Sequence, residues 1–120
     1  MNTEQSSQHQ NLAKGRWFKL SFFEQMANIG SEIERAIKWR GKNKEYSRLA
    51  SDRALELLDL TIADQKNRRR LKEIVRLREV MADYFYFDNI YGSTPQNWRN
   101  YFYAFNYAAN LPDSPLSRSD

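Results

Sequence analysis

The sequence predicts an all-α protein, and three features of the chain support this prediction. Apolar residues recur every three or four positions, the spacing of one helical face, as in the series Phe22, Met26, Ile29, Ile33 and Ile37. The period-two alternation of a half-buried strand is absent, and the chain has only four glycines and three prolines. Because short connections join four helical stretches, we expect a single antiparallel, up-down-up-down four-helix bundle.

The first two helices are expected on either side of the turn "GKNK". The first is predicted from about Trp17 to Arg40, with Gly41 as its C-terminal cap. The second is predicted over residues 45–63. One side of this second helix gathers apolar and small residues and is expected to be buried: Tyr46, Leu49, Ala50, Ala54, Leu57 and Thr61.

The third helix is predicted over residues 68–87 and the fourth over residues 95–110. Either Asp64 or Asn67 can supply the N-cap of the third helix, and both alternatives remain open. The fourth helix starts after Thr94, an N-cap residue that is followed by a proline at the first helical position. The segment "LPDSP" then ends this helix.

The length and composition indicate one globular domain. A chain of 120 residues has the size of a single domain. We expect this domain over residues 16–111, with flexible polar tails at residues 1–15 and 112–120. The N-terminal stretch lacks the apolar region of a secretory signal, and no apolar run approaches the roughly 20 residues that span a bilayer. A cytoplasmic protein without membrane contact is therefore expected.

Residues needed for several kinds of catalysis are missing. No cysteine is present, which excludes disulfides, thiol nucleophiles and cysteine-ligated zinc. His9, in the N-terminal tail, is the only histidine, which excludes a Ser-His-Asp triad, a di-iron bundle and an arginine–histidine ribonuclease motif. Acids at helical spacing, such as Asp52, Glu56 and Asp59, are more typical of a solvated face than of a magnesium site. We expect no catalytic residue, metal or cofactor, and rank a small enzyme with a carboxylate site third among the functions.

Positive charge is concentrated in two islands, although the whole chain carries only +4. Residues 38–48 contain five cations and one acid, and residues 66–78 contain seven cations and one acid. The remainder of the chain is therefore acidic overall. This uneven distribution indicates an anionic partner more clearly than the net charge does.

The expected contacts with an anionic partner come from both islands. Helical phase places four cations on one outward arc of the third helix: Arg68, Arg69, Lys72 and Arg76. Arg70 instead turns toward the apolar side of this helix. Cations beside the free N–H groups of a helix N-terminus form an anion site, but if Asp64 is the cap, the arginines fall in the second turn. A second patch is expected at the opposite end of the bundle: Lys38, Arg40, Lys42 and Lys44. A solvated surface without a partner is the alternative interpretation.

Two further arginines are predicted to point toward the core. By helical phase, Arg53 lies between leucines of the second helix and Arg78 lies near apolar residues of the third. A buried guanidinium needs a carboxylate or carbonyl partner, and Glu34 and Asp88 are the expected partners. An internal ion-pair network and a pocket for an anionic ligand both remain open.

Outward-facing aromatic residues predict an interface. Tyr103 and Tyr107 lie one turn apart on the fourth helix, opposite Phe105, and Tyr86 and Phe87 fall on the outward arc of the third. Clustered exposed aromatics are typical of interfaces, and beside amides and arginine they also stack on bases. A homo-oligomer is therefore expected, the alternative being a fourth helix that is buried on more than one side.

In its size, basic islands and expected bundle, the chain resembles two groups of small helical proteins. These are the proteins encoded in ribosomal intervening sequences and the accessory proteins of diversity-generating retroelements. The likeness lies in the architecture, carries over no functional residue, and implies a basic, oligomeric binding module. Our leading hypothesis is a non-enzymatic bundle that binds RNA, DNA or a ribonucleoprotein. A protein–protein adaptor or antitoxin-like partner is the alternative.

Overall fold

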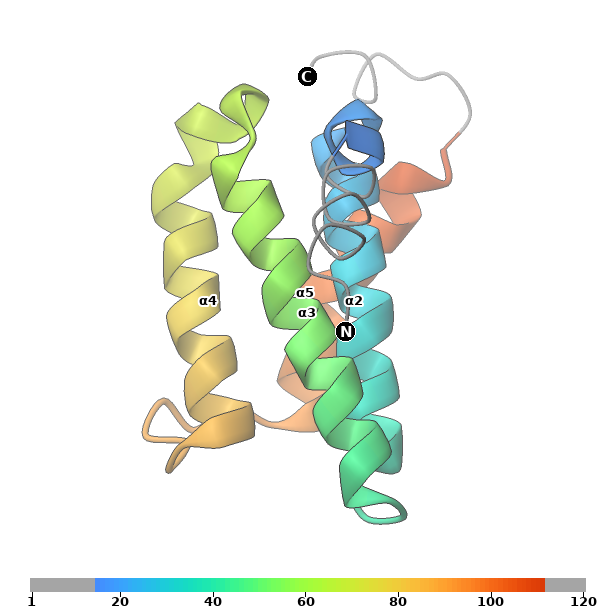
Figure 1. Cartoon of the computed structure of the whole chain (residues 1–120), viewed down its shortest axis with the longest axis vertical. Helices are drawn as coiled ribbons and strands as arrows, with labels where there is room; N and C mark the ends of the chain where they lie inside the picture. Colours follow the sequence, from blue (N-terminus) through green and yellow to red (C-terminus); the bar gives the residue numbers. More distant parts are fainter. Residues whose placement is uncertain (1–14, 112–120) are drawn as a thin grey trace, which may run out of the picture.

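The computed structural model describes residues 15–111, and within this range every regular element is helical (Figure 1). After a helical segment at residues 15–19, the elements are α2 (Phe22–Trp39), α3 (Lys44–Ala63), the 3₁₀ helix η1 (Gln65–Arg70), α4 (Leu71–Tyr86) and α5 (Pro95–Ala109). The all-α prediction is confirmed. A single four-helix bundle is not confirmed, because the described residues form five α-helical segments. The expected tails lie outside the described residues, except that Gly15 is helical.

The predicted first helix is interrupted at Ser21. The Ser21 hydroxyl accepts a hydrogen bond from the Glu24 amide at 3.1 Å, and the Ser21 amide donates to Glu24 Oε1 at 3.0 Å. This capping box starts α2 as a new helix, so residues 15–19 form a separate segment. The segment is anchored to the rest of the domain because Trp17 is buried.

The turn between α2 and α3 does not use the glycine cap that the sequence predicts. Gly41 does not adopt the left-handed backbone conformation of such a cap. Instead, the Asn43 side-chain oxygen accepts hydrogen bonds from the amides of Glu45 and Tyr46, each at 3.1 Å. Asn43 therefore determines where α3 begins.

The range predicted for the second helix matches α3, but the predicted buried face is rotated. Tyr46 and Leu49 are exposed. The face of α3 in the interior is formed at its start by small residues: Ser47, Ala50, Ser51 and Ala54. Small side chains let neighbouring helices approach closely, which explains why they are buried in place of the larger residues.

The four long helices share one core, and α2 lies at its centre. Successive helices run in opposite directions, with α3 and α5 packed against α2 and α4 packed against α3 (Figure 1). Gly30 permits the close approach of α5, because a Cβ atom at this position would lie 2.8 Å from Phe102 Cβ. The largest fully buried apolar side chains come from α2, α3 and α4: Phe22, Met26, Ile29, Ile33, Leu58, Ile74 and Met81. None of the described helices is long and apolar enough to cross a membrane.

Candidate anion-binding surfaces

A buried polar network holds η1 against α2 and α3. The Gln25 side chain donates to Asp64 Oδ2 at 2.8 Å and accepts from Asn67 Nδ2 at 2.9 Å. Asn67 also donates to the Thr61 carbonyl oxygen at 2.9 Å, and the Thr61 hydroxyl accepts from the Trp17 indole at 3.0 Å. All five side chains are buried, so the network gives η1 a fixed place relative to the core.

Of the two caps left open by the sequence, Asp64 is the one used, although it caps η1 and not α4. Asp64 Oδ1 accepts from the Lys66 amide at 3.2 Å. Burial alone would raise the pKa of Asp64, but hydrogen bonds from Lys66 and Gln25 outweigh it and lower the pKa below its ordinary value. Asp64 is therefore an ionised group that Lys66 neutralises, while the Lys66 ammonium also donates to the Phe18 carbonyl oxygen at 2.9 Å.

The three consecutive arginines of η1 have unequal environments. Arg70 is half-buried, and its guanidinium carbon lies 4.3 Å from the centre of the Phe22 ring and 5.6 Å from that of Phe23. Arg68 and Arg69 are exposed and make no hydrogen bond, ion pair or ring contact with any residue of the described range. As helical phase predicts, Arg70 turns inward while Arg68 and Arg69 face solvent.

A cleft of about 570 Å³ opens beside these arginines. α4 begins directly after η1, and no side chain caps its N-terminus. The Leu71 amide already donates to the Arg68 carbonyl oxygen, so the clustered cationic side chains, and not free helix amides, favour a bound anion here. The lining of the cleft contains four cations and no acid: Phe22, Gln65, Lys66, Asn67, Arg68, Arg69 and Arg70.

Lys72, in the first turn of α4, extends the cationic area. It is exposed and has no hydrogen-bond or ion-pair partner within residues 15–111. Arg76 lies one turn further along α4, with its guanidinium carbon 4.8 Å from the centre of the Tyr91 ring. We refer to the cations around η1 as the η1 surface: Lys66, Arg68, Arg69, Arg70 and Lys72.

The second predicted patch lies at the turn between α2 and α3. Arg40 donates to the Tyr84 carbonyl oxygen at 3.1 Å, and its guanidinium carbon lies 4.5 Å from the centre of the Tyr84 ring. The lysines of this patch are exposed and unpaired with any described residue: Lys38, Lys42 and Lys44. Since α2 has 18 residues and a helix rises roughly 1.5 Å per residue, this patch and the η1 surface are about 27 Å apart along α2. This agrees with their expected placement at opposite ends.

Eight arginines of the described residues fall into two classes, while Arg68, Arg69 and Arg16 belong to neither. The first class forms ion pairs with carboxylates: Arg35, Arg53, Arg78 and Arg99. The second class lies over aromatic rings and has no carboxylate within ion-pair distance in residues 15–111: Arg40, Arg48, Arg70 and Arg76. Every member of the second class belongs to one of the two basic islands. Aromatic rings therefore position these charges without neutralising them.

The predicted core-facing arginines are not buried. Arg53 is exposed, and within residues 15–111 its only ionic contact is with Glu56 at 3.6 Å. Arg78 is half-buried and donates from Nε to Asp59 Oδ1 at 2.6 Å, which links α4 to α3. The prediction for Arg53 failed because the buried face of α3 is rotated toward its small residues.

Their expected partners lie elsewhere on the surface. Glu34 is exposed and accepts a hydrogen bond from Arg99 Nε at 3.0 Å, which links α2 to α5. Asp88 is exposed and has no ion pair within the described range. Neither the internal ion-pair network nor the anionic-ligand pocket expected around these residues is therefore present.

Three of the four aromatic residues predicted at an interface are exposed. The exposed fractions are 74% for Phe87, 70% for Tyr103 and 61% for Tyr107. Tyr86 is the exception, because its hydroxyl donates to Asp52 Oδ1 and its ring packs against α3. The prediction that Tyr86 faces outward is therefore wrong, and the exposed tyrosine pair lies on α5 alone.

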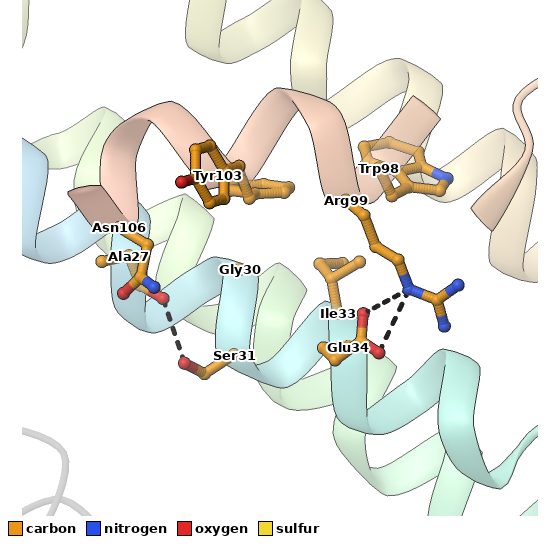
Figure 2. A pocket seen from close by; sticks show the side chains of 10 residues that line it. Ala27, Gly30, Ser31, Ile33, Glu34, Trp98, Arg99, Tyr103 and Asn106 are labelled. Atoms are coloured by element: carbon orange, nitrogen blue, oxygen red, sulfur yellow. Dashed lines mark hydrogen bonds and ion pairs between the residues drawn. The ribbon is translucent and has the colours of Figure 1, made fainter. Parts of the chain in front are cut away.

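A cleft of about 370 Å³ lies beside Tyr103, between α2 and α5 (Figure 2). The ion pair of Arg99 and Glu34 lies toward one end of this cleft in Figure 2, and Asn106 lies toward the other. Trp98 also lines the cleft, and its buried indole nitrogen has no hydrogen-bond partner in the described part of the chain. The tyrosines of α5 thus border a hollow between helices.

Sequence reasoning missed two cations that the structure brings into these surfaces. Lys66 lines the η1 cleft, and Arg48 lies with its guanidinium carbon 5.2 Å from the centre of the Tyr86 ring. Arg48 follows Lys44 by four residues, so helical spacing could have predicted that the two lie on the same face of α3. Lys66 belongs to the 3₁₀ helix η1, which precedes α4 and does not follow the spacing of an α-helix.

Within residues 15–111, no group of three or more His, Cys, Asp or Glu side chains is arranged to hold a metal ion. Comparison of the chain with protein-family models, curated proteins and solved structures finds no significant match.

Proposed function

We propose that the protein binds nucleic acid through the phosphate backbone, with the η1 surface as the principal contact, and acts by binding and not by catalysis. The observation that carries this proposal is the unneutralised charge of the basic islands. Arg68, Arg69 and Lys72 form no ion pair with any acid of the described residues, and Arg70 is held by the Phe22 ring. Apart from Lys66, which pairs with Asp64, the η1 surface keeps its cations without a carboxylate partner, and such a surface is matched to a polyanion.

The stacked arginines strengthen this proposal on physical grounds. A guanidinium that rests on an aromatic face keeps its planar set of N–H donors available at the edge. Fixing a long side chain before binding also reduces the conformational entropy that binding would otherwise cost. Phosphate groups accept the paired hydrogen bonds that such an edge offers.

The patch at the α2–α3 turn serves as a second contact in this proposal. The roughly 27 Å between the two surfaces corresponds to about eight base-pair steps of B-form duplex at ~3.4 Å each. A nucleic acid would therefore have to lie along the helices to reach both surfaces. RNA and DNA both present the required phosphates.

The test replaces Arg68, Arg69 and Lys72 with alanine and measures binding to RNA and DNA over a range of salt concentrations. Loss of three phosphate contacts should weaken binding and lower the salt slope, log K against log[salt], by about two to three. The matched control removes the same charge from ion-paired positions: Arg35, Arg53 and Arg99. Unchanged affinity and slope in the η1 variant would rule out this surface as the contact.

The exposed tyrosines of α5 support a second part of the proposal, self-association of the protein. Tyr103 and Tyr107 are one helical turn apart and both more than half exposed, which is typical of an interface. The same surface would suit a protein adaptor without nucleic-acid contact, which remains the alternative. Co-purification with and without nuclease separates the two, because an adaptor keeps its partner after nuclease treatment.

A further inference from the structure

A cleft of about 290 Å³ lies where the C-terminal end of α2, the start of α3 and the end of α4 meet. Arg40 comes from the C-cap of α2, and Lys44 and Arg48 come from the first two turns of α3. Phe85 of α4 forms an apolar wall, and the small side chains of Ser47 and Ser51 complete the lining. The cleft therefore collects three cations from two helices.

These three cations are not neutralised. In the described range, no carboxylate lies within ion-pair distance of Arg40, Lys44 or Arg48. Lys44 and Arg48 are one helical turn apart on α3, a spacing at which like charges repel. On α3, Glu45 follows Lys44 directly and Asp52 lies one turn after Arg48. Neither acid forms an ion pair with these cations, and Asp52 accepts a hydrogen bond from the Tyr86 hydroxyl. The cleft thus has an excess of positive charge that an anion would relieve.

Both arginines are held in place by contacts that leave most of their donors free. One Nη2 donor of Arg40 is used by the Tyr84 carbonyl oxygen, at 3.1 Å, and the guanidinium lies over the Tyr84 ring. Arg48 lies over the ring of Tyr86, with 5.2 Å between its guanidinium carbon and the ring centre. Since a guanidinium has five N–H donors, each arginine retains several for a ligand.

The serines contribute space and no further donors. The Ser47 hydroxyl donates to the Ala36 carbonyl oxygen at 2.7 Å, and the Ser51 hydroxyl donates to the Arg48 carbonyl oxygen at 3.0 Å. Recognition in this cleft must therefore come from the three cationic side chains. Hard, multiply charged anions with several acceptor oxygens match such a set of donors.

We propose that this cleft binds a phosphate group, either a terminal phosphomonoester or free inorganic phosphate. A phosphomonoester or inorganic phosphate carries close to two negative charges near neutral pH and offers at least three acceptor oxygens to Arg40, Lys44 and Arg48. A backbone phosphodiester carries one charge and therefore balances less of the positive charge of the cleft. The proposal goes beyond nucleic-acid binding at the η1 surface, because the cleft binds the group whether or not a nucleic acid carries it.

The first experiment titrates inorganic phosphate into the full chain at low ionic strength and follows backbone amide resonances by NMR. Saturable shifts should concentrate in residues 40–51 and on Phe85. The test variant is Lys44→Gln with Arg48→Gln, which leaves Arg40 and its contact with α4 intact. It should weaken phosphate binding at least about tenfold, because two charge-assisted interactions are lost.

The matched control is Lys38→Gln with Lys42→Gln, which removes the same charge from the same island but from residues outside the cleft. It should retain affinity within about threefold when the titration is repeated near 0.15 M salt, because exposed charges more than about 8 Å from the ion are then largely screened. Lys44→Gln alone serves if the double variant fails to fold. Absence of saturable shifts, or an equal loss of affinity in the control, would overturn the proposal.

The source of the phosphate is resolved with two oligonucleotides of identical sequence, one with a 5′-phosphate and one with a 5′-hydroxyl. Tighter binding of the 5′-phosphorylated strand, lost in the variant of Lys44 and Arg48, would assign the cleft to nucleic-acid ends. Equal binding of both strands, together with saturable binding of inorganic phosphate, would assign it to free phosphate. Failure here leaves binding at the η1 surface unaffected, because that surface is tested with different variants.

Discussion

The side-chain amide of Gln25 donates a hydrogen bond of 2.8 Å to the carboxylate of Asp64 in the protein interior. This contact joins α2 to the residue at which α3 ends and η1 begins. Because Lys66 pairs with the same carboxylate, one ionised group joins the basic segment to the core, beside the hydrogen bonds of Asn67. The charge of Asp64 therefore contributes to holding the η1 surface in place.

Stability should decline in acid because of Asp64. The pKa of Asp64 is lowered in the folded state. Its contribution to the free energy of unfolding is therefore fully present above the unfolded-state pKa of about 3.9, and it is lost as the pH falls through the folded-state pKa. Asp64→Asn should destabilise the protein by about 1–3 kcal/mol at neutral pH and flatten the pH dependence below about 5. Urea unfolding at several pH values measures both effects.

The matched control is Asp59→Asn, which removes a half-exposed partner of Arg78. A surface ion pair of this kind contributes roughly 0–1 kcal/mol, so its loss should change stability little. An acid response in Asp64→Asn as steep as in the wild type would contradict the role given to Asp64.

The sequence predicts the long helices of this fold better than it predicts where they are interrupted. The long helices follow from apolar spacing, which is repeated many times and so tolerates local exceptions. The break at Ser21 was also present in the sequence, since "SFFE" has the serine and glutamate of a capping box at the required separation. The apolar stripe continuing on both sides of Ser21 concealed it.

The buried polar network could not have been predicted in the same way. Gln25 lies 42 residues from Asn67 in the chain. The burial of Gln25, Thr61 and Asn67 depends on tertiary contacts that pair their polar atoms. Likewise, the exposure of Leu49 and the burial of Ser47 reverse the order that hydrophobicity predicts. Where two helices pack closely, the distance between their axes determines which side chains fit. The periodicity of a sequence does not give this distance.

Gly30→Ala should destabilise the protein. A Cβ atom at this position would lie 2.8 Å from Phe102 Cβ and 2.9 Å from two of its ring atoms, so α5 would have to move away from α2. Overpacking of this kind costs about 1–3 kcal/mol, which the higher helix propensity of alanine offsets by at most about 1 kcal/mol. Thermal and urea unfolding measure the difference. Gly41→Ala, with open space around the added atom, is the control and should be near neutral.

Stability should also decline in strong alkali because of Tyr101. Burial, together with the charge and hydrogen bond of Glu73, raises the pKa of Tyr101. The hydroxyl stays protonated in the folded protein while the unfolded chain ionises near pH 10, so the free energy of unfolding falls as the pH rises above about 10. Tyr101→Phe should reduce this alkaline loss, whereas Tyr103→Phe, which alters an exposed ring, should not. Equal slopes in the two variants would argue against the assignment.

Self-association should depend on the two exposed tyrosines of α5. Burying aromatic area stabilises a complex by roughly 25 cal/mol per Å² before association costs are subtracted, and Tyr103 and Tyr107 offer two adjacent rings beside a hollow. Replacing both with serine should lower the mass measured by light scattering while leaving helical content intact. Tyr46→Ser, at an exposed tyrosine on α3, should leave the mass unchanged. A wild-type protein that is already monomeric at high micromolar concentration would refute self-association, and the tyrosines would then be available to a different partner.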